Sequence, residues 1–124
     1  MILSHIIELV AICAKKGIKN VILSPGSRCA PLTLAFARHP DIHTRTISDE
    51  RSAAFIALGM AQQLEEPVAL VCTSGSAALN YFPAIAEAYF QKFLCSSSLL
   101  IDPMNGLINT TAKQYSKREF METM

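Results

Sequence analysis

The chain has 124 residues, of which 51% are hydrophobic and 17% are charged. This length predicts one modest globular domain, and the composition excludes an intrinsically disordered chain. A net charge of +1 offers no electrostatic basis for binding nucleic acid or an anionic membrane. No apolar run approaches the roughly 18 residues that a membrane-spanning helix requires.

The cysteines and histidines form no pattern of metal ligands. There is no C-x-x-C motif and no His pair at ligand spacing. We therefore assign no residue as a metal ligand, and we expect neither zinc nor a disulfide framework. A reducing cytoplasm is the expected location.

The first half of the chain predicts two helices around one strand. Apolar residues recur at helical spacing from Ile6 to Ala14, with Ser4 available as an N-cap and Gly17 as the stop. Residues 20–23 (NVIL) are a short β-rich run. It ends at SPGSR, and residues 31–39 (PLTLAFARH) then read as a helix with a proline in its first turn.

The second half repeats this alternation twice. Residues 43–48 (HTRTIS) predict a strand, and residues 49–66 predict a helix whose acidic start suits the helix dipole. Residues 67–75 (PVALVCTSG) are nearly all apolar, as in a strand covered on both faces. Residues 76–91 again have a helical pattern, interrupted by Pro83. Alternating strands and helices with short connections predict an α/β fold, with a parallel sheet, flanking helices and right-handed crossovers.

Three strand-to-helix loops carry the candidate chemistry, and they read SPGSR, SDER and CTSGS. In a parallel sheet such loops converge at the carboxyl ends of the strands, where ligands bind. Helix N-termini favour anions there, and Arg28 can offer a two-pronged contact to a carboxylate or phosphate. Gly26 and Gly75 allow tight turns and close backbone approach. None of the loops is a Walker A or G-x-G-x-x-G motif.

Each feature also has a purely structural interpretation. The glycines can be ordinary turn residues, and Ser74 and Ser76 can be helix caps. Glu50 can be a first-turn acid with Arg28 or Arg51 as a surface partner. Only the expected convergence of all three loops at one edge favours a functional interpretation.

The amino-acid sequences of these loops resemble those of one enzyme family. VILSPGSRCAPLTLAFARHP, ISDERSAAFIALGMAQ and PVALVCTSGSAALNYFPAIAEAY, in that order, are similar to the start of 2-succinyl-5-enolpyruvyl-6-hydroxy-3-cyclohexene-1-carboxylate (SEPHCHC) synthase. The resemblance covers about residues 6–91. It implies a thiamine-diphosphate-dependent transferase of menaquinone biosynthesis, with residues 1–91 as the N-terminal part of its pyrimidine-binding domain.

The resemblance also implies substrates, cofactors and site residues. The family decarboxylates 2-oxoglutarate on thiamine diphosphate and adds the product to isochorismate, with Mg²⁺ holding the cofactor diphosphate. Glu50 then matches the catalytic glutamate that hydrogen-bonds the aminopyrimidine and promotes its imino tautomer. A carboxyl in a partly desolvated cleft can share a proton in this way. Ser27 and Arg28 match substrate-carboxylate contacts, and the cofactor-binding loop matches Thr73, Ser74 and Gly75.

The resemblance stops near Gln91, and residues 92–124 look aberrant. After this helix the family has a strand and a loop that reads approximately D-R-P-x-E-W, then Q and G-Q-T-I. This chain instead has IDPMNGLINTTAKQ, in which only a strand at residues 99–101 is suggested. A genuinely divergent or frayed terminal extension is one explanation.

A shifted reading frame is the other explanation, and we favour it. Read from the third base of each codon, Met104–Asn105 encodes Glu whatever codons are used, because the bases are ATG and AAY. Other junctions also permit the family residues: Leu100–Ile101 allows Asp, Ile101–Asp102 gives Arg or a stop, Asp102–Pro103 gives Pro or Ser, and Asn105–Gly106 gives Trp or Arg. Further on, the junction Ile108–Asn109 allows Gln. Four later junctions permit the G-Q-T-I run: Thr111–Ala112 allows Gly, Ala112–Lys113 allows Gln, Lys113–Gln114 gives Thr or Ala, and Gln114–Tyr115 gives Ile or Val. We expect the slip near residues 91–93.

This interpretation limits what the chain can do by itself. In the family, the site forms between the pyrimidine domain of one subunit and the diphosphate domain of another, within a homo-oligomer. We therefore expect these 124 residues alone to be inactive. Two other hypotheses stay open. One is a fragment of another thiamine-diphosphate 2-oxoacid decarboxylase or an acetolactate synthase-like enzyme, and the other is a non-catalytic anion-binding α/β module.

Overall fold

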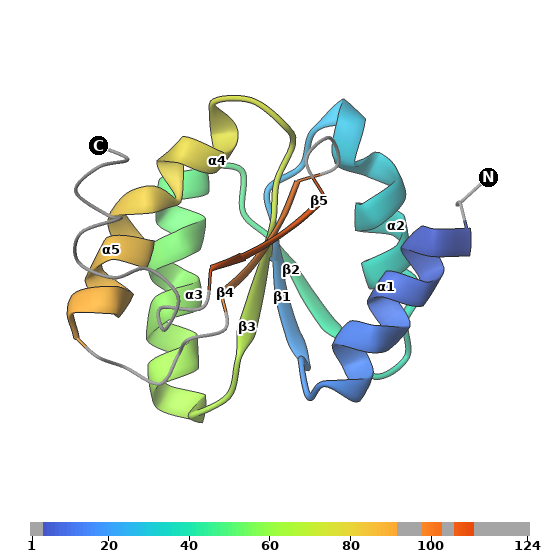
Figure 1. Ribbon diagram of the computed structural model, residues 1–124, viewed down its shortest axis with the longest axis horizontal. Coiled ribbons are helices and arrows are strands. Elements are labelled where there is room, and N and C mark those ends of the chain that lie inside the picture. The colour runs from blue at the N-terminus through green and yellow to red at the C-terminus, as the bar shows by residue number, and fades with distance from the viewer. Residues whose placement is uncertain (1–3, 92–97, 103–105, 111–124) are drawn as a thin grey trace.

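A five-stranded sheet forms the centre of the protein, and helices flank it on both sides (Figure 1). This computed structural model describes residues 4–91, 98–102 and 106–110. The strand order is β2-β1-β3-β4-β5. The parallel strands are β1 (Asn20–Leu23), β2 (His43–Thr46), β3 (Val68–Val71) and β4 (Ser98–Asp102), and β5 (Gly106–Thr110) is antiparallel to β4. The predicted α/β class with a parallel sheet is confirmed.

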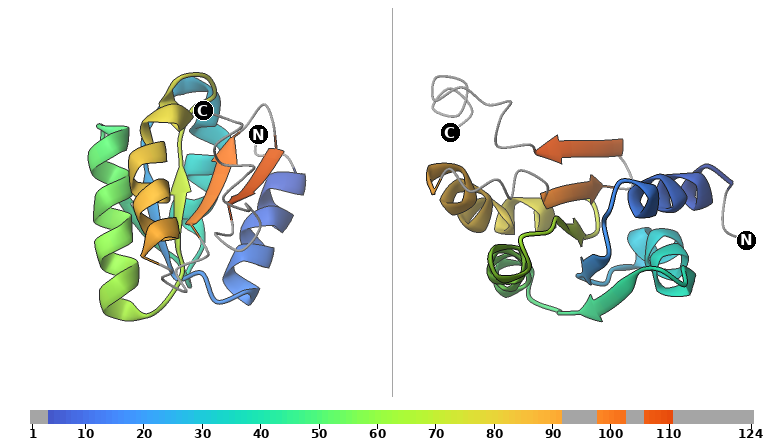
Figure 2. Two further views of the ribbon diagram at one scale, coloured as in Figure 1. Left: turned by 60° about the vertical axis from the view of Figure 1, so that its left-hand side comes forward. Right: turned by 90° about the horizontal axis from the view of Figure 1, so that it is seen from below.

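Two helical layers cover the sheet (Figure 2). On one side lie α1 (Ser4–Lys15) and α2 (Ala30–Arg38), the latter preceded by a short 3-10 turn, η1 (Ser27–Cys29). On the other side lie α3 (Glu50–Leu64), α4 (Ala77–Asn80) and α5 (Phe82–Phe90). The chain therefore places the helix that follows β1 and the helices that follow β3 on opposite sides of the sheet.

Alternating strand residues divide the core into two halves. Val21 and Leu23 of β1 pack with α1 and α2, whereas Ile22 between them packs with α3. All four residues of β3 are buried, as its unbroken apolar pattern predicts for a strand covered on both faces. Among β1, β2 and β3, the adjacent strands β1 and β3 are thus the most enclosed, and β2, the outermost strand beside β1, is largely exposed.

Most element boundaries follow from the local sequence. Gly17 ends α1 as predicted, with a positive φ of 87°. The amide of Ile18 donates to Cys13 O at 3.1 Å and that of Gly17 to Ala14 O at 3.0 Å, which is the hydrogen-bond pattern of a Schellman cap. The helical pattern of residues 76–91 breaks into α4 and α5 just before Pro83, because proline lacks the amide that a continuous helix needs.

The expected strand at residues 99–101 is confirmed by β4, which pairs with β3 through Leu70–Leu100 and Val71–Ile101. The sheet thus continues past β3. Most of residues 92–124, for which an aberrant tail is predicted, lies outside the described residues. Among the helices that the structure describes, none combines the length and apolar character needed to cross a membrane.

Candidate functional site

The candidate site lies where β1 and β3 end. The helix that follows β1 covers one face of the sheet and the helices that follow β3 cover the other, so the two connections diverge. In open parallel sheets this divergence creates the crevice in which ligands bind. The three predicted loops all follow the carboxyl ends of parallel strands, so their convergence at one edge is confirmed.

Backbone hydrogen bonds hold the three strand ends in register beyond the sheet itself. The amide of Ile47, just after β2, donates to Leu23 O at 2.9 Å. The amide of Ser24, just after β1, donates to Val71 O at 2.8 Å. The three loops therefore start from strand ends that are held together by hydrogen bonds.

The first and third loops are in direct contact through Gly26 and Thr73. A Cβ added at Gly26 would lie 2.6 Å from Thr73 Cβ, closer than real side chains approach one another. Gly26 itself has an extended backbone, with φ −161°. Position 26 therefore requires glycine because there is no room for a side chain. Gly75 is different, because its φ of 101° is a conformation that disfavours any side chain, while the space around it is open.

Glu50 is the first residue of α3 and is partly buried. Its neighbour Asp49 is the N-cap, and the Asp49 carboxylate accepts a hydrogen bond from the Ser52 amide at 2.8 Å. This bond lowers the pKa of Asp49. Asp49 thus satisfies a free amide of the first turn, and the Glu50 carboxyl is not used as the cap.

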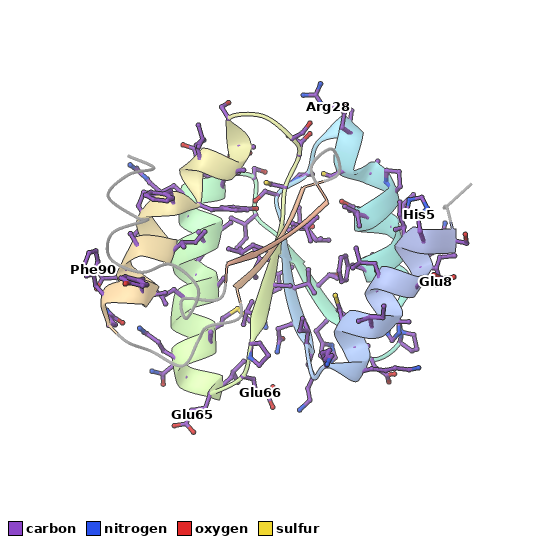
Figure 3. The ribbon with its side chains drawn as sticks, in the orientation of Figure 1. His5, Glu8, Arg28, Glu65, Glu66 and Phe90 are labelled. Carbon is purple, nitrogen blue, oxygen red and sulfur yellow. The ribbon has the colours of Figure 1, made fainter. Side chains whose placement is uncertain are left out.

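Ser27 and Arg28 lie on η1, directly after Gly26, and both are exposed. Figure 3 shows Arg28 extending from the carboxyl edge of the molecule away from the sheet. Thr73 and Ser74 are partly buried on the loop after β3, and Gly75 is exposed. The first and third loops are brought together by the contact between Gly26 and Thr73, and Glu50 starts the helix that follows the second.

Buried polar residues beneath these loops were not anticipated from the sequence. Tyr81 has no exposed surface, and Ser24 is 1% exposed. Tyr81 Oη lies 3.0 Å from Ser24 Oγ and 3.1 Å from Val71 O. Burial raises the pKa of Tyr81, and the nearby negative charge of Glu50 adds to this rise.

The thiol of Cys29 has a local partner in the SPGSR loop. It is fully buried, with Sγ 3.3 Å from Gly26 O and 3.8 Å from Ser24 O. This contact folds the SPGSR loop back on itself. Across residues 4–91 and the two described strands beyond, the structure contains no cluster of His, Cys, Asp and Glu that could hold a metal ion.

The chain belongs to the family of thiamine pyrophosphate enzymes, through their N-terminal TPP binding domain, which matches residues 7–94. Thiamine pyrophosphate is the cofactor named thiamine diphosphate above. The chain is 65% identical over 83 residues to the SEPHCHC synthase of Christiangramia forsetii and 58% identical over 85 residues to that of Flavobacterium johnsoniae. These matches cover 67% and 68% of this chain, but only 14% and 15% of those proteins.

A solved structure has the same fold. Benzoylformate decarboxylase from Polynucleobacter necessarius superposes with a TM-score of 0.63 at 24% identity. The superposition covers 78% of this chain and 17% of that one. At this identity the structural likeness supports only the fold. The family membership rests on the sequence matches.

Proposed function

We propose that residues 1–91 form the N-terminal part of the pyrimidine-binding domain of a SEPHCHC synthase, which acts on 2-oxoglutarate and isochorismate with thiamine diphosphate. The observation that carries this proposal is the identity of 55–65% to several SEPHCHC synthases over 83–87 residues. The family match over residues 7–94 includes all three loops of the carboxyl edge. The structural likeness to a decarboxylase supports only the shared fold. Another thiamine-diphosphate enzyme and a non-catalytic anion-binding module are therefore the alternatives to be tested.

The residues of this edge suit part of the cofactor. Glu50 offers a partly buried carboxyl at the open end of the sheet, and Thr73 and Ser74 offer hydroxyl groups on the adjoining loop. Thiamine diphosphate, when bound, supplies the carbon nucleophile of the reaction. Our assignment is that Glu50 exchanges a proton with the aminopyrimidine ring, for which a carboxyl shielded from bulk water is suited.

Ser27 and Arg28 are the proposed contacts for a substrate carboxylate. Both are exposed on η1, so they can be reached by a ligand at this edge. A guanidinium group forms paired hydrogen bonds with a carboxylate, and both proposed substrates carry carboxylates. Thr73, Ser74 and Gly75 are assigned to the cofactor side of the same crevice.

The family resemblance places Mg²⁺ and the cofactor diphosphate on another domain, so we propose that both are held by parts of the enzyme outside these residues. We therefore propose that the 124-residue chain is inactive alone and requires a second domain, supplied within a homo-oligomer. Among the described residues, Cys13, Cys29 and Cys72 are buried and are not joined in disulfide bonds, in keeping with our proposal of a reducing cytoplasm.

A segment exchange tests the proposed function. The 83 matched residues of the Christiangramia forsetii enzyme would be replaced by those of this chain, and SEPHCHC formation from isochorismate and 2-oxoglutarate would be measured. We expect the hybrid enzyme to retain activity, with the 124-residue chain as the inactive control. A folded hybrid that binds thiamine diphosphate but makes no SEPHCHC would contradict the proposal.

We also propose that residues 92–124 are translated out of frame. The family match ends at residue 94, near the expected slip. Sequencing the DNA from codon 88 onward gives the test. A shifted frame that spells D-R-P-x-E-W and stays open supports the proposal, whereas one that closes at once makes the tail authentic.

A further inference from the structure

Tyr81 connects two site loops from a distant position in the chain. It lies at the junction of α4 and α5, and its side chain is completely buried. Its hydroxyl reaches Ser24, 57 residues earlier, and the carbonyl of Val71, ten residues earlier. Ser24 is the first residue after β1 and Val71 is the last residue of β3.

The chemistry of the groups sets the direction of each hydrogen bond. A carbonyl oxygen can only accept, so the Tyr81 hydroxyl donates to Val71 O and accepts from the Ser24 hydroxyl. The Ser24 amide also donates to Val71 O, at 2.8 Å. Three hydrogen bonds thus join Tyr81, Ser24 and Val71 in a closed ring, which we call the Tyr81 clamp. Because the ring is buried, each bond is protected from competing water.

The clamp lies at the base of the first and third loops, where each loop leaves its strand. Ser24 begins the loop that carries Ser27 and Arg28, and Val71 is two residues before Thr73. A few residues further out the loops meet again, because Gly26 leaves no room beside Thr73. The two loops are consequently held together at two points. One is the clamp at the strand ends, and the other is the Gly26–Thr73 contact, two residues further along each loop.

We propose that Tyr81 is a positioning residue, whose hydroxyl fixes the spacing of the two loops by joining Ser24 to Val71 across the ends of β1 and β3. Its effect on catalysis rests on the proposed function, since that function places substrate contacts on one loop and cofactor contacts on the other.

A simpler role would be to fill the core. Phenylalanine would fill almost the same volume and lose only the hydroxyl, so Tyr81→Phe separates the two roles. If Tyr81 only fills space, this variant alters overall stability without selectively loosening Ser24. If the clamp positions the loops, the Ser24 amide becomes selectively more mobile.

Amide hydrogen exchange by NMR on the full 124-residue chain tests the clamp directly. In Tyr81→Phe we expect the Ser24 amide to exchange about tenfold faster, which matches the loss of one buried hydrogen bond. The Ile18 amide, bonded to Cys13 O at the other end of the sheet, should keep its rate and reports general destabilisation. Tyr89→Phe, which removes a hydroxyl from α5 where the ring packs against Phe90, should leave both rates unchanged. Equal acceleration of Ser24 and Ile18, or none, would overturn the proposal.

The hybrid enzyme adds a kinetic readout that a purely structural role would not change. In Tyr81→Phe we expect KM for isochorismate and for thiamine diphosphate to rise about tenfold, with a smaller change in kcat. The double variant Tyr81→Phe/Ser24→Ala leaves no hydroxyl unsatisfied, so its stability should recover while KM stays raised. A KM that returns together with stability would contradict positioning. A parent hybrid that folds and binds thiamine diphosphate but makes no SEPHCHC would refute the proposed function, and the exchange experiment would still decide the clamp.

Discussion

The two ends of the sheet are built from the same strands, yet their polar residues are used in opposite ways. At the carboxyl edge, Ser24 and Tyr81 are buried and joined by hydrogen bonds, and Gly26 has no room for a side chain. At the amino edge, Lys19 and Glu66 form an exposed ion pair at 2.8 Å, with 61% and 36% of the side chains accessible. Figure 3 shows Glu66 at the end opposite to Arg28.

This difference shows where the fold restricts substitution. Buried polar groups and tight contacts cost free energy when one member changes, because the partner is left unsatisfied or displaced. Removing one member of an exposed ion pair costs little free energy, because water solvates the charge that remains. A polar network buried at the carboxyl edge, where an α/β sheet binds ligands, is therefore consistent with a functional role for that edge. Four predictions test this contrast, starting with the largest expected effect.

The largest effect is expected for Glu50→Gln in the hybrid enzyme. Glutamine keeps the size of the side chain but cannot exchange a proton, so kcat should fall about 10²- to 10⁴-fold, the range typical of a lost acid–base group. Asp49→Asn is the matched control: it removes the adjacent carboxylate but keeps a side chain that caps α3. Steady-state kinetics of both variants gives the answer, and a Glu50→Gln hybrid with near-normal kcat would refute the catalytic assignment.

The next effect is expected for Gly26→Ala. The new Cβ would lie 2.6 Å from Thr73 Cβ, which is bonded to the backbone and cannot rotate away, so the two loops must separate. Overpacking of this kind costs about 1–3 kcal/mol of unfolding free energy. Urea unfolding of the 124-residue chain measures this cost.

Gly59→Ala provides the control for Gly26→Ala. Gly59 lies inside α3, and nothing lies within 4 Å of an added Cβ. Alanine there should stabilise the chain by up to about 1 kcal/mol, because glycine is the poorer helix former. If the two alanine variants shifted the urea midpoint in the same direction, the close contact between the loops would be disproved.

The elements of the fold were predictable because their signals are local. Residues 20–23 were predicted as a strand and form β1, and Gly17 ends α1 by its positive φ. Strand β2 is shorter than its predicted range 43–48, although Ile47 still donates to Leu23 O. The polar Thr46 and Ser48 do not signal where sheet pairing stops, because that depends on the neighbouring strand.

The candidate site was only partly predictable, because its internal contacts are not local. The convergence of the three loops follows from a parallel sheet, and it is confirmed. Nothing near Tyr81 in the sequence indicates a bond to a serine 57 residues away. The two glycines look alike in sequence, but one is needed for space and the other for its backbone angle. The individual roles of Glu50, Ser27, Arg28, Thr73, Ser74 and Gly75 stay predictions.

A third, smaller effect is expected in the pH dependence of stability. Burial raises the pKa of Tyr81 in the folded chain, whereas an unfolded tyrosine ionises near pH 10, as is usual. Folding therefore favours the protonated phenol: its contribution is complete below about pH 10 and is lost as the pH rises further. In Tyr81→Phe this part of the loss should vanish.

The measurement is the free energy of unfolding between about pH 9 and 11.5, a window around the ordinary tyrosine pKa. The difference between the unchanged chain and Tyr81→Phe should approach a slope of about 1.4 kcal/mol per pH unit at the upper end. Cys13, whose thiol pKa is also raised by burial, is present in both chains and cancels. Parallel curves over the whole range would show that the Tyr81 hydroxyl is not buried in the folded chain.

The smallest effect is expected at the amino edge, for the pair Lys19 and Glu66. A double-mutant cycle with Lys19→Ala and Glu66→Ala should give a coupling energy of about 0.2–1 kcal/mol, because both side chains keep substantial contact with water. The coupling should disappear in about 1 M salt, where charges are screened within roughly 3 Å. By contrast, the coupling between Tyr81→Phe and Ser24→Ala should persist in salt, since that contact is buried and involves no formal charge. If both couplings faded with salt, the carboxyl edge would be as open to solvent as the amino edge, and the contrast between the two ends would fail.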